Sequence, residues 1–71
     1  PTIQQLKCLL CYGKENNFTR GAQQAKYTQS AFSVQIKKLE ETVGLELIQR
    51  TNKGSHLTPS GEKMLAMLKN T

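Results

Sequence analysis

Short hydrogen-bonding side chains and lysines follow one another between residues 29 and 38. Gln29, Ser30 and Ser33 can donate to or accept from the edges of base pairs, and a glutamine can pair with the N6 and N7 edge of adenine. Lys37 and Lys38 can neutralise phosphates, which positions a protein on a duplex without specifying sequence. This stretch therefore has the chemistry of a DNA-reading surface. The plainer alternative is the solvated side of an ordinary helix.

Val34 lies in the middle of this stretch and is an apolar exception. Apolar residues recur with helical spacing on the opposite side. They are Phe32, Ile36, Leu39 and Val43. Since Val34 lies about 180° from that face, it is expected to be exposed, where it could contact a thymine methyl group. A single exposed valine is also common and needs no function.

The charge distribution points to a polyanionic partner. The chain carries a net charge of +5 and has a pI of about 9.5, which draws a small domain to phosphate or to anionic lipid. No acidic residue lies between Glu15 and Glu40, or between Leu47 and Gly61. These two segments carry cations, namely Arg20, Lys26, Lys37, Lys38, Arg50 and Lys53. Randomly scattered charges could produce one such gap, but two gaps favour a surface kept free of acids.

Further contacts are expected from two other places. Arg20, with Thr19, falls in the first turn of a short helix, where free backbone N–H groups and the helix dipole favour phosphate. Arg50, Thr51 and Lys53 fall in an expected hairpin that could reach phosphates or an adjacent minor groove. For each of these residues the alternative is a solvated surface side chain.

Residues for catalysis or metal binding are not grouped in this sequence. Cys8 and Cys11 form a C-x-x-C pair, but the only histidine is the distant His56, whereas zinc sites need four ligands. The cysteines are expected to be reduced, half-buried small hydrophobes, and His56 a surface residue. No paired carboxylates, activated nucleophile or glycine-rich phosphate loop is recognisable. The sequence thus predicts no enzyme, no metal and no cofactor.

Three helices are expected to position the DNA-reading stretch. The first spans about residues 2–15, with Ile3, Leu6, Leu9 and Leu10 toward the core. The second spans residues 18–25 behind an Asn17 cap, with Phe18, Ala22 and Ala25 facing inward. The third follows a cap at Thr28 and ends at Val43, before a Gly44 stop. So short a connection between the last two helices requires a steep crossing, as in a helix-turn-helix.

A hairpin and a fourth helix complete the expected fold. The strands are "LELIQR" and "SHLT" around "TNKG", with Asn52 and Gly54 in left-handed conformations at the tip. Thr58 caps the fourth helix and Pro59 takes its first position. This order predicts an all-α fold with a small β-hairpin wing, a winged helix-turn-helix. Residues 1–58 form that domain, and residues 59–71 begin a linker helix that the chain carries only in part.

The fourth helix has an apolar stripe of Met64, Leu65 and Leu68. We expect it to form a dimer contact, because a 71-residue chain has little core left to cover it. The open alternative is that the stripe folds back on the domain. No run of about 18 apolar residues is present, so no membrane partner is expected. No secretory signal is visible either.

The chain resembles the N-terminal DNA-binding domain of LysR-type bacterial transcriptional regulators. The resemblance lies in "NNFTRGAQQA", similar to Ser-Phe-Thr-x-Ala-Ala, in "TQSAFSVQIKKLEETVGLELIQR", similar to Ser-Gln-Pro-Ala-x-Ser-x-x-Ile-x-x-Leu-Glu-x-x-x-Gly-x-x-Leu-Phe-x-Arg, and in "LTPSG". It implies double-stranded promoter DNA as the partner, a homodimer or tetramer formed through the linker helix, and a small-molecule effector bound by a C-terminal domain absent here. It also implies a location in the bacterial cytoplasm, at the nucleoid. The DNA contacts it implies are Thr28, Gln29, Ser30, Ser33, Val34, Lys37, Arg50 and Lys53.

Four positions depart from the family pattern. Ser30 replaces a usual proline, Val34 a common basic residue and Lys53 a frequent wing arginine. These three changes bear on the target sequence. Ala25 replaces a leucine, and Tyr27 is expected to fill part of the space. The competing function is a winged-helix module that binds protein and not DNA, whose affinity would depend little on salt.

Overall fold

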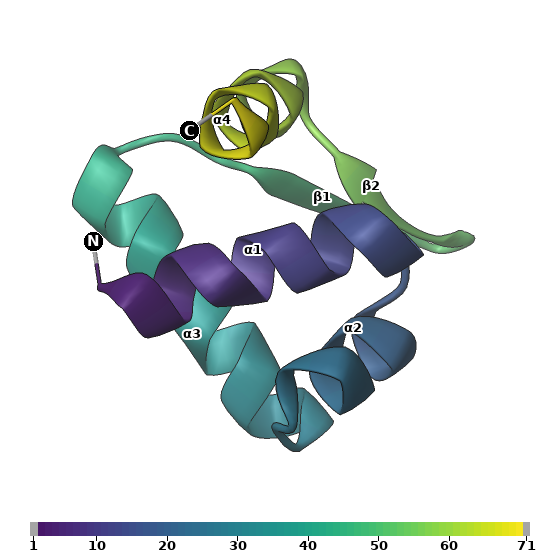
Figure 1. Cartoon of the computed structure of the whole chain (residues 1–71). Helices are drawn as coiled ribbons and strands as arrows, with labels where there is room; N and C mark the ends of the chain where they lie inside the picture. Colours follow the sequence, from purple (N-terminus) through teal and green to yellow (C-terminus); the bar gives the residue numbers. More distant parts are fainter. Residues whose placement is uncertain (1, 71) are drawn as a thin grey trace.

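The computed structural model describes residues 2–70 as a helical domain with one hairpin (Figure 1). The order is α1 (Ile3–Glu15), α2 (Phe18–Ala25), α3 (Gln29–Val43), β1 (Ile48–Thr51), β2 (Gly54–Leu57) and α4 (Pro59–Lys69). The two strands pair antiparallel, from Ile48 opposite Leu57 to Thr51 opposite Gly54. This is the predicted winged helix-turn-helix. The first strand starts later than predicted, because residues 45–47 form the link that follows α3.

Each helix starts at a side-chain cap that occupies an otherwise unpaired backbone N–H. Asn17, Thr28 and Thr58 accept from the third residue of their helices at 2.9, 3.1 and 3.0 Å, as predicted. At α1 the cap is Thr2, which forms a capping box with Gln5. Local sequence thus fixes where α2 and α3 begin, and with them the geometry of the helix-turn-helix.

The turn between α2 and α3 is fixed by backbone hydrogen bonds. Lys26 takes the left-handed conformation with φ 61°, and the N–H of Tyr27 donates to the carbonyl of Ala22 at 2.9 Å. Gly44 ends α3 with φ 73°, as predicted. At the hairpin tip, Gly54 has φ 129°, but the left-handed conformation predicted for Asn52 is wrong. The strand register leaves residues 52 and 53 as a two-residue loop, in which only the glycine that follows needs a positive φ.

The buried face of α3 was predicted correctly, and that of α1 was predicted in part, since Leu9 is buried and Leu6 and Leu10 pack against the core. Phe32, Ile36 and Leu39 are buried, and Val43 is half-buried. In α1, Ile3 is 82% exposed, so its predicted core position is wrong. The stripe that enters the core runs through Gln5, Cys8, Leu9 and Tyr12. This face includes polar residues because their polar atoms are paired within the fold: Gln5 in the capping box and the Tyr12 hydroxyl with Ser55.

Aromatic rings join the first three helices. Phe18 lies 5.2 Å from Tyr12 and 5.9 Å from Phe32 between ring centroids, in tilted and edge-on orientations. A Cβ at Gly21 would lie 3.0 Å from the Phe32 ring, so this glycine allows α2 to approach α3 closely. Phe18 is half-buried in this cluster rather than fully inward-facing. One side of it therefore stays accessible to the hairpin.

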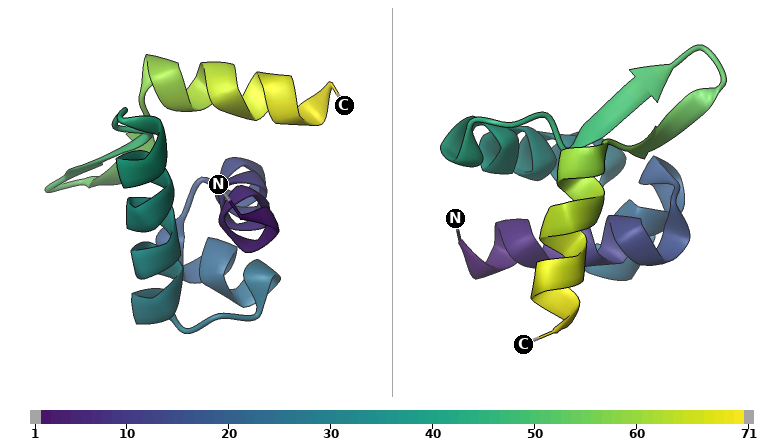
Figure 2. Two further views of the ribbon diagram at one scale, coloured as in Figure 1. Left: turned by 90° about the vertical axis from the view of Figure 1, so that its left-hand side faces the viewer. Right: turned by 90° about the horizontal axis from the view of Figure 1, so that it is seen from above.

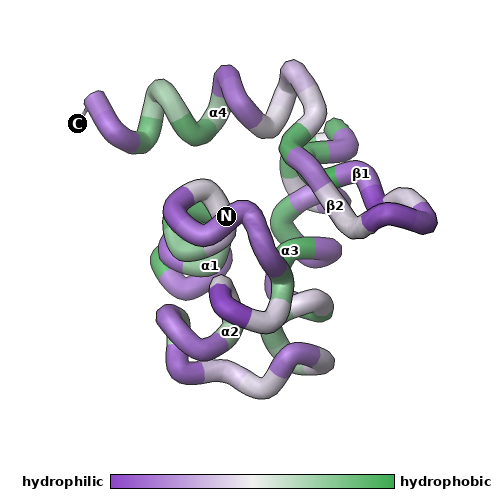
Figure 3. The backbone as a smooth tube through the Cα atoms, turned by 90° about the vertical axis from the view of Figure 1, so that its right-hand side faces the viewer, coloured by the Kyte–Doolittle hydropathy of each residue, from purple (hydrophilic) through white to green (hydrophobic). Residues whose placement is uncertain are grey.

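The fourth helix lies across α1 and runs away from α3 (Figure 2). Leu65, predicted at a dimer contact, is only 7% exposed and belongs to the core of this domain. It reaches the core because Gly13 of α1 has no side chain, and a Cβ there would meet Leu65 at 2.3 Å. Met64 and Leu68 are half-buried against the core, and Met67 is 63% exposed. Much of the apolar stripe therefore packs back on the domain, which is the alternative to a dimer contact. The hairpin tip, in contrast to this stripe, is hydrophilic and projects from the helices (Figure 3).

Candidate nucleic-acid interface

The outer side of α3 carries the predicted DNA-reading residues. Gln29, Ser30 and Lys37 are exposed, Ser33 is half-exposed, and Val34 is 48% exposed, as expected from its place opposite the core. The hairpin projects on this same side of the molecule, whereas α1 and α2 cover the other side of α3 (Figure 2). The helix-turn-helix and the hairpin therefore present one common surface.

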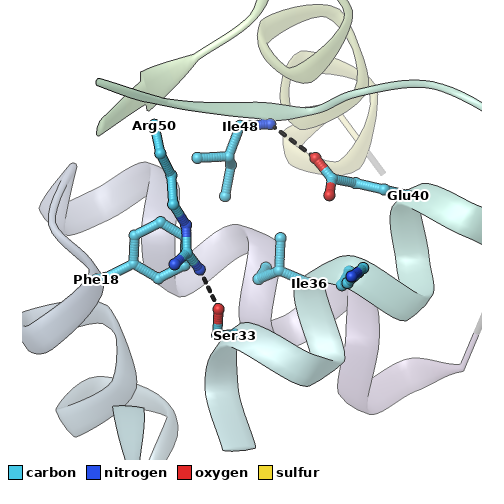
Figure 4. Close-up of a pocket in the computed structure, with 7 residues that line it drawn as sticks. Phe18, Ser33, Ile36, Glu40, Ile48 and Arg50 are labelled. Atoms are coloured by element: carbon cyan, nitrogen blue, oxygen red, sulfur yellow. Dashed lines mark hydrogen bonds between the residues drawn. The ribbon is translucent and has the colours of Figure 1, made fainter. Parts of the chain in front are cut away.

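Arg50 lies against the helices instead of extending from the hairpin. Its guanidinium carbon is 4.1 Å from the centroid of the Phe18 ring, and Nη2 donates a hydrogen bond to Ser33 Oγ (Figure 4). Three elements thus meet at one side chain: β1 supplies the cation, α2 the ring and α3 the hydroxyl. The sequence predicted Arg50, Thr51 and Lys53 as one group on the hairpin, and the structure divides this group.

Thr51 and Lys53 belong to the tip of the hairpin. The Thr51 hydroxyl donates to the carbonyl of Gly54 at 3.2 Å and accepts from the N–H of Lys53 at 3.3 Å. These bonds order the backbone of the tip and leave the Lys53 side chain exposed. Lys53 therefore places an exposed cation at the tip of the hairpin.

Three adjoining hollows connect the predicted residues, and Arg50 lines all three. One is lined by Gln29, Ser30, Ser33 and Arg50. The next lies between α3 and β1 and includes Ser33, Lys37, Glu40 and Arg50 (Figure 4). The third lies between the start of α2 and the hairpin, and includes Gln29, Arg50, Thr51 and Lys53. The structure therefore joins the start of α3 to the hairpin in a continuous surface centred on Arg50.

Arg20 is not part of that surface. It is exposed and lines a separate hollow with Glu15, Gln23, Gln24 and Lys26. Its backbone N–H donates to the Asn17 side chain at 2.9 Å, so only its side chain remains as a candidate phosphate donor. Lys38 is exposed farther round α3.

Gln29 is oriented by a contact from the preceding helix. The hydroxyl of Thr19 donates to Gln29 Oε1 at 3.3 Å. This bond uses an acceptor of the amide and leaves its NH₂ group available to donate to a partner outside the protein. Thr28, in turn, uses its oxygen to accept the N–H of Ala31, which leaves its hydroxyl hydrogen as a donor.

Two contacts that hold the hairpin were not predicted from the sequence. Glu40 Oε2 accepts from the N–H groups of Leu47 and Ile48 at 2.8 and 3.1 Å, which fixes the start of β1 on α3. The Tyr12 hydroxyl lies 2.6 Å from Ser55 Oγ and fixes β2 on α1. Both contacts join residues distant in sequence, so no local pattern marks them. The motif match included Glu40 but gave it no role.

The cysteines behave as structural residues. Cys11 is half-buried, as predicted, whereas Cys8 is fully buried in the core and not half-buried as expected. Burial raises the pKa of the Cys8 thiol, nearby Cys11 raises it further, and Lys7 partly offsets both effects. Between residues 2 and 70, no His, Cys, Asp or Glu side chains are grouped as metal ligands, and His56 is exposed on β2. Within the same range, no helix has the length and apolar character to cross a bilayer.

Helices α2 and α3 cross steeply, the hairpin lies beside them, and their outer surface is cationic. These features together define a winged helix-turn-helix domain of the kind found in transcriptional regulators. Residues 3–62 match the model of the bacterial regulatory helix-turn-helix protein, lysR family. The chain belongs to this family.

Named relatives are transcriptional regulators. The chain is 37% identical over 60 residues to the regulator YofA of Bacillus subtilis, which covers 84% of this chain and 21% of the relative. It is 35% identical over 66 residues to PgrR of Escherichia coli, which covers 93% of this chain and 22% of that protein. The chain therefore spans about a fifth of the length of these relatives.

Solved structures share the fold. DarR of Vibrio fischeri, solved in complex with DNA, superposes with a TM-score of 0.90 at 37% identity over 99% of this chain and 24% of that one. The BenM DNA-binding domain, solved with benA site 1 DNA, gives a TM-score of 0.85 at 27% identity over 99% of this chain and 83% of that one. The whole chain thus has the architecture of these DNA-binding domains.

Proposed function

We propose that this chain binds double-stranded DNA in a sequence-specific manner, as the DNA-binding part of a bacterial LysR-type transcriptional regulator. In this proposal α3 enters the major groove and the hairpin lies on phosphates or an adjacent minor groove. The observation that carries it is the continuous surface around Arg50, where short donors and acceptors of α3 lie beside cations from α3 and the hairpin.

The surface divides into residues suited to bases and residues suited to phosphates. Gln29, Ser30, Ser33 and Val34 are the candidates for base edges, since they have short or apolar side chains on the outer side of α3. The candidates for the sugar-phosphate backbone are Thr28, Lys37, Lys38, Arg50, Thr51 and Lys53, together with Arg20, which lies apart from this surface. Glu40, the acid that lines this surface, accepts the backbone N–H groups of Leu47 and Ile48 with one carboxylate oxygen, which offsets part of its negative charge.

Similar proteins support this proposal. DarR and the BenM domain were solved with DNA, and both have the fold of this chain at 37% and 27% identity. Each superposition covers 99% of this chain, so the similarity extends over the short α2, the outward-facing α3 and the hairpin.

The remainder of such a regulator would supply oligomerisation and regulation. We propose that residues 59–71 begin a linker helix after the DNA-binding unit of residues 1–58, and that a homodimer or tetramer forms along this helix. Met67 and the accessible parts of Met64 and Leu68 would face the partner, since Leu65 is engaged in the core. A small-molecule effector would bind a C-terminal domain outside this chain, and the protein would work in the bacterial cytoplasm at the nucleoid.

Selection of duplexes from a random pool, followed by titration of the selected and scrambled sequences between 50 and 200 mM salt, tests the proposal. Gln29→Ala should weaken the selected duplex by about 5- to 150-fold and relax sequence preference there, with little effect on the scrambled one. Lys37→Ala should weaken both duplexes and lower the slope of log affinity against log salt by about one unit.

The matched control is Lys69→Ala on α4, an exposed lysine on the helix that runs away from α3 (Figure 2). It should leave the slope of the parent unchanged. Equal, weak binding of all duplexes by the parent would refute sequence-specific recognition. An affinity for some protein that does not fall with salt would favour the alternative function, a protein-binding module.

A further inference from the structure

A long, exposed arginine side chain on a hairpin usually samples many rotamers, and ordering it on binding costs free energy. Arg50 differs, because its guanidinium lies over an aromatic ring and also donates to a hydroxyl group. The Phe18 ring lies 4.1 Å from the guanidinium carbon, and Ser33 Oγ accepts from Nη2. The guanidinium is therefore held in a single place before any ligand arrives.

The ring under Arg50 is itself immobilised. Phe18 is the first residue of α2, directly after the Asn17 cap, and its ring packs against Tyr12 and Phe32. Since these rings belong to α1 and α3, the platform is fixed relative to the outer side of α3. The position of the Arg50 charge is thus set by the helical core and not by the hairpin that carries it.

We propose that Phe18 is a positioning residue that makes Arg50 part of the α3 recognition surface. In this arrangement Arg50 and Lys37, which line the same hollow, grip one stretch of sugar-phosphate backbone beside α3, and the minor-groove side is left to Lys53 at the tip. The inference deepens the proposed function and rests on it.

The chemistry of the hollow favours a phosphodiester. Two cations line it, and the one carboxylate there, Glu40, accepts two backbone N–H groups. The guanidinium uses its carbon for the ring contact and Nη2 for Ser33, so its remaining N–H groups can donate to the anionic oxygens of a phosphate. Ser33 accepts from Arg50, which leaves its hydroxyl hydrogen to donate. Ser33 would then select base edges that accept, such as guanine N7 and O6 or thymine O4.

The size of the effect follows from the cation–π contact. At exposed sites such a contact contributes about 0.5–1 kcal/mol, which corresponds to about 2- to 5-fold in affinity when it holds the side chain in its bound position. A purely structural role for Phe18 would change stability and would not depend on the presence of the Arg50 guanidinium.

A double-mutant cycle on DNA affinity separates these roles. We would compare the parent with Phe18→Leu, Arg50→Ala and the double variant, and confirm by circular dichroism that each is folded at the assay temperature. Phe18→Leu should weaken the selected duplex about 2- to 5-fold in the parent and have no further effect beside Arg50→Ala. Phe18→Tyr, which keeps the ring, should bind like the parent.

Equal losses from Phe18→Leu in both backgrounds would overturn the inference. So would an Arg50→Ala variant with the salt slope of the parent, because Arg50 would then touch no phosphate. Proton NMR of the parent gives a second measurement that needs no variant and no DNA. The Arg50 side-chain protons should be shifted upfield by the Phe18 ring, and ordinary shifts would refute the placement. Failure of the parent to bind any duplex would instead count against the proposed function alone.

Discussion

Replacement of Gly61 with alanine tests how closely α4 approaches Leu47, the last residue of the link before β1. Helix propensity predicts a gain of about 1 kcal/mol from this change inside a helix. The structure predicts the opposite, because a Cβ at residue 61 would lie 2.1 Å from the carbonyl oxygen of Leu47. Contacts of Cβ atoms below 3.0 Å are essentially not observed, so α4 and Leu47 would have to separate by about 0.9 Å.

The separation would disturb contacts on both sides of the glycine. The same Leu47 oxygen accepts the N–H of Thr58 at 2.9 Å, and the Thr58 hydroxyl donates to the carbonyl of Glu46 at 2.5 Å. Displacement of α4 would also withdraw Leu65 from the core. Overpacking costs about 1–3 kcal/mol and a weakened hydrogen bond about 0.5–1.5 kcal/mol, against the propensity gain of about 1 kcal/mol. The expected net loss is about 1–3 kcal/mol, out of the roughly 4–11 kcal/mol typical of a domain this size.

Thermal unfolding followed by circular dichroism measures this loss. For a domain of this size Tm falls by about 4–8 °C per kcal/mol, so Gly61→Ala should lower Tm by roughly 4–24 °C. Ala66→Gly, at an exposed position of the same helix, measures the propensity term in reverse and should cost about 1 kcal/mol. A Gly61→Ala protein as stable as the parent, together with a destabilised Ala66→Gly protein, would show that α4 does not pack this closely on Leu47.

Four further substitutions, one of them a control, test the core and the hairpin. Tyr12→Phe removes only the hydroxyl that bonds Ser55 and should cost about 0.5–1.5 kcal/mol in urea unfolding, and no loss would mean that β2 is not anchored there. Leu65→Ala should cost about 2–5 kcal/mol because its side chain is buried, whereas Met67→Ala should change stability by less than about 0.5 kcal/mol; similar costs for both would contradict the burial seen for α4. Because the pKa of the Cys8 thiol is raised in the folded protein, the unfolded chain loses this proton at a lower pH than the folded chain does. The group therefore stabilises the fold fully at neutral pH, and progressively less as the pH rises through 9.0, the ordinary pKa of the thiol. The stability difference between the parent and Cys8→Ala should therefore shrink in alkaline solution, and a constant difference from pH 7 to 10 would refute the burial of this thiol.

Much of the fold was predictable from local signals. The caps at Asn17, Thr28 and Thr58 and the stop at Gly44 depend on hydrogen bonds within a few residues of each other, so the printed sequence contains them completely. The inward face of α3 follows from helical periodicity for the same reason. Periodicity placed Leu6, Leu9 and Leu10 of α1 correctly but failed at Ile3, because the buried face is set by which helix packs against it.

The surface of α3 and its cationic surroundings were also readable from the sequence, since residue type and the absence of nearby acids do not depend on packing. The place of Arg50 was not. Its neighbours Phe18 and Ser33 are 32 and 17 residues away in the chain, and a sequence pattern carries no information about which side chains meet across such separations.

The sequence by itself therefore determined the elements, their ends and the chemistry of the outer face of α3, because each depends on interactions between near neighbours. Only the tertiary structure decided that the Arg50 side chain contacts α3, that Leu65 is buried in the core and that Glu40 binds the backbone at the start of β1. These outcomes depend on the space left by small residues such as Gly13 and Gly61, and on polar atoms that find partners only when distant segments come together.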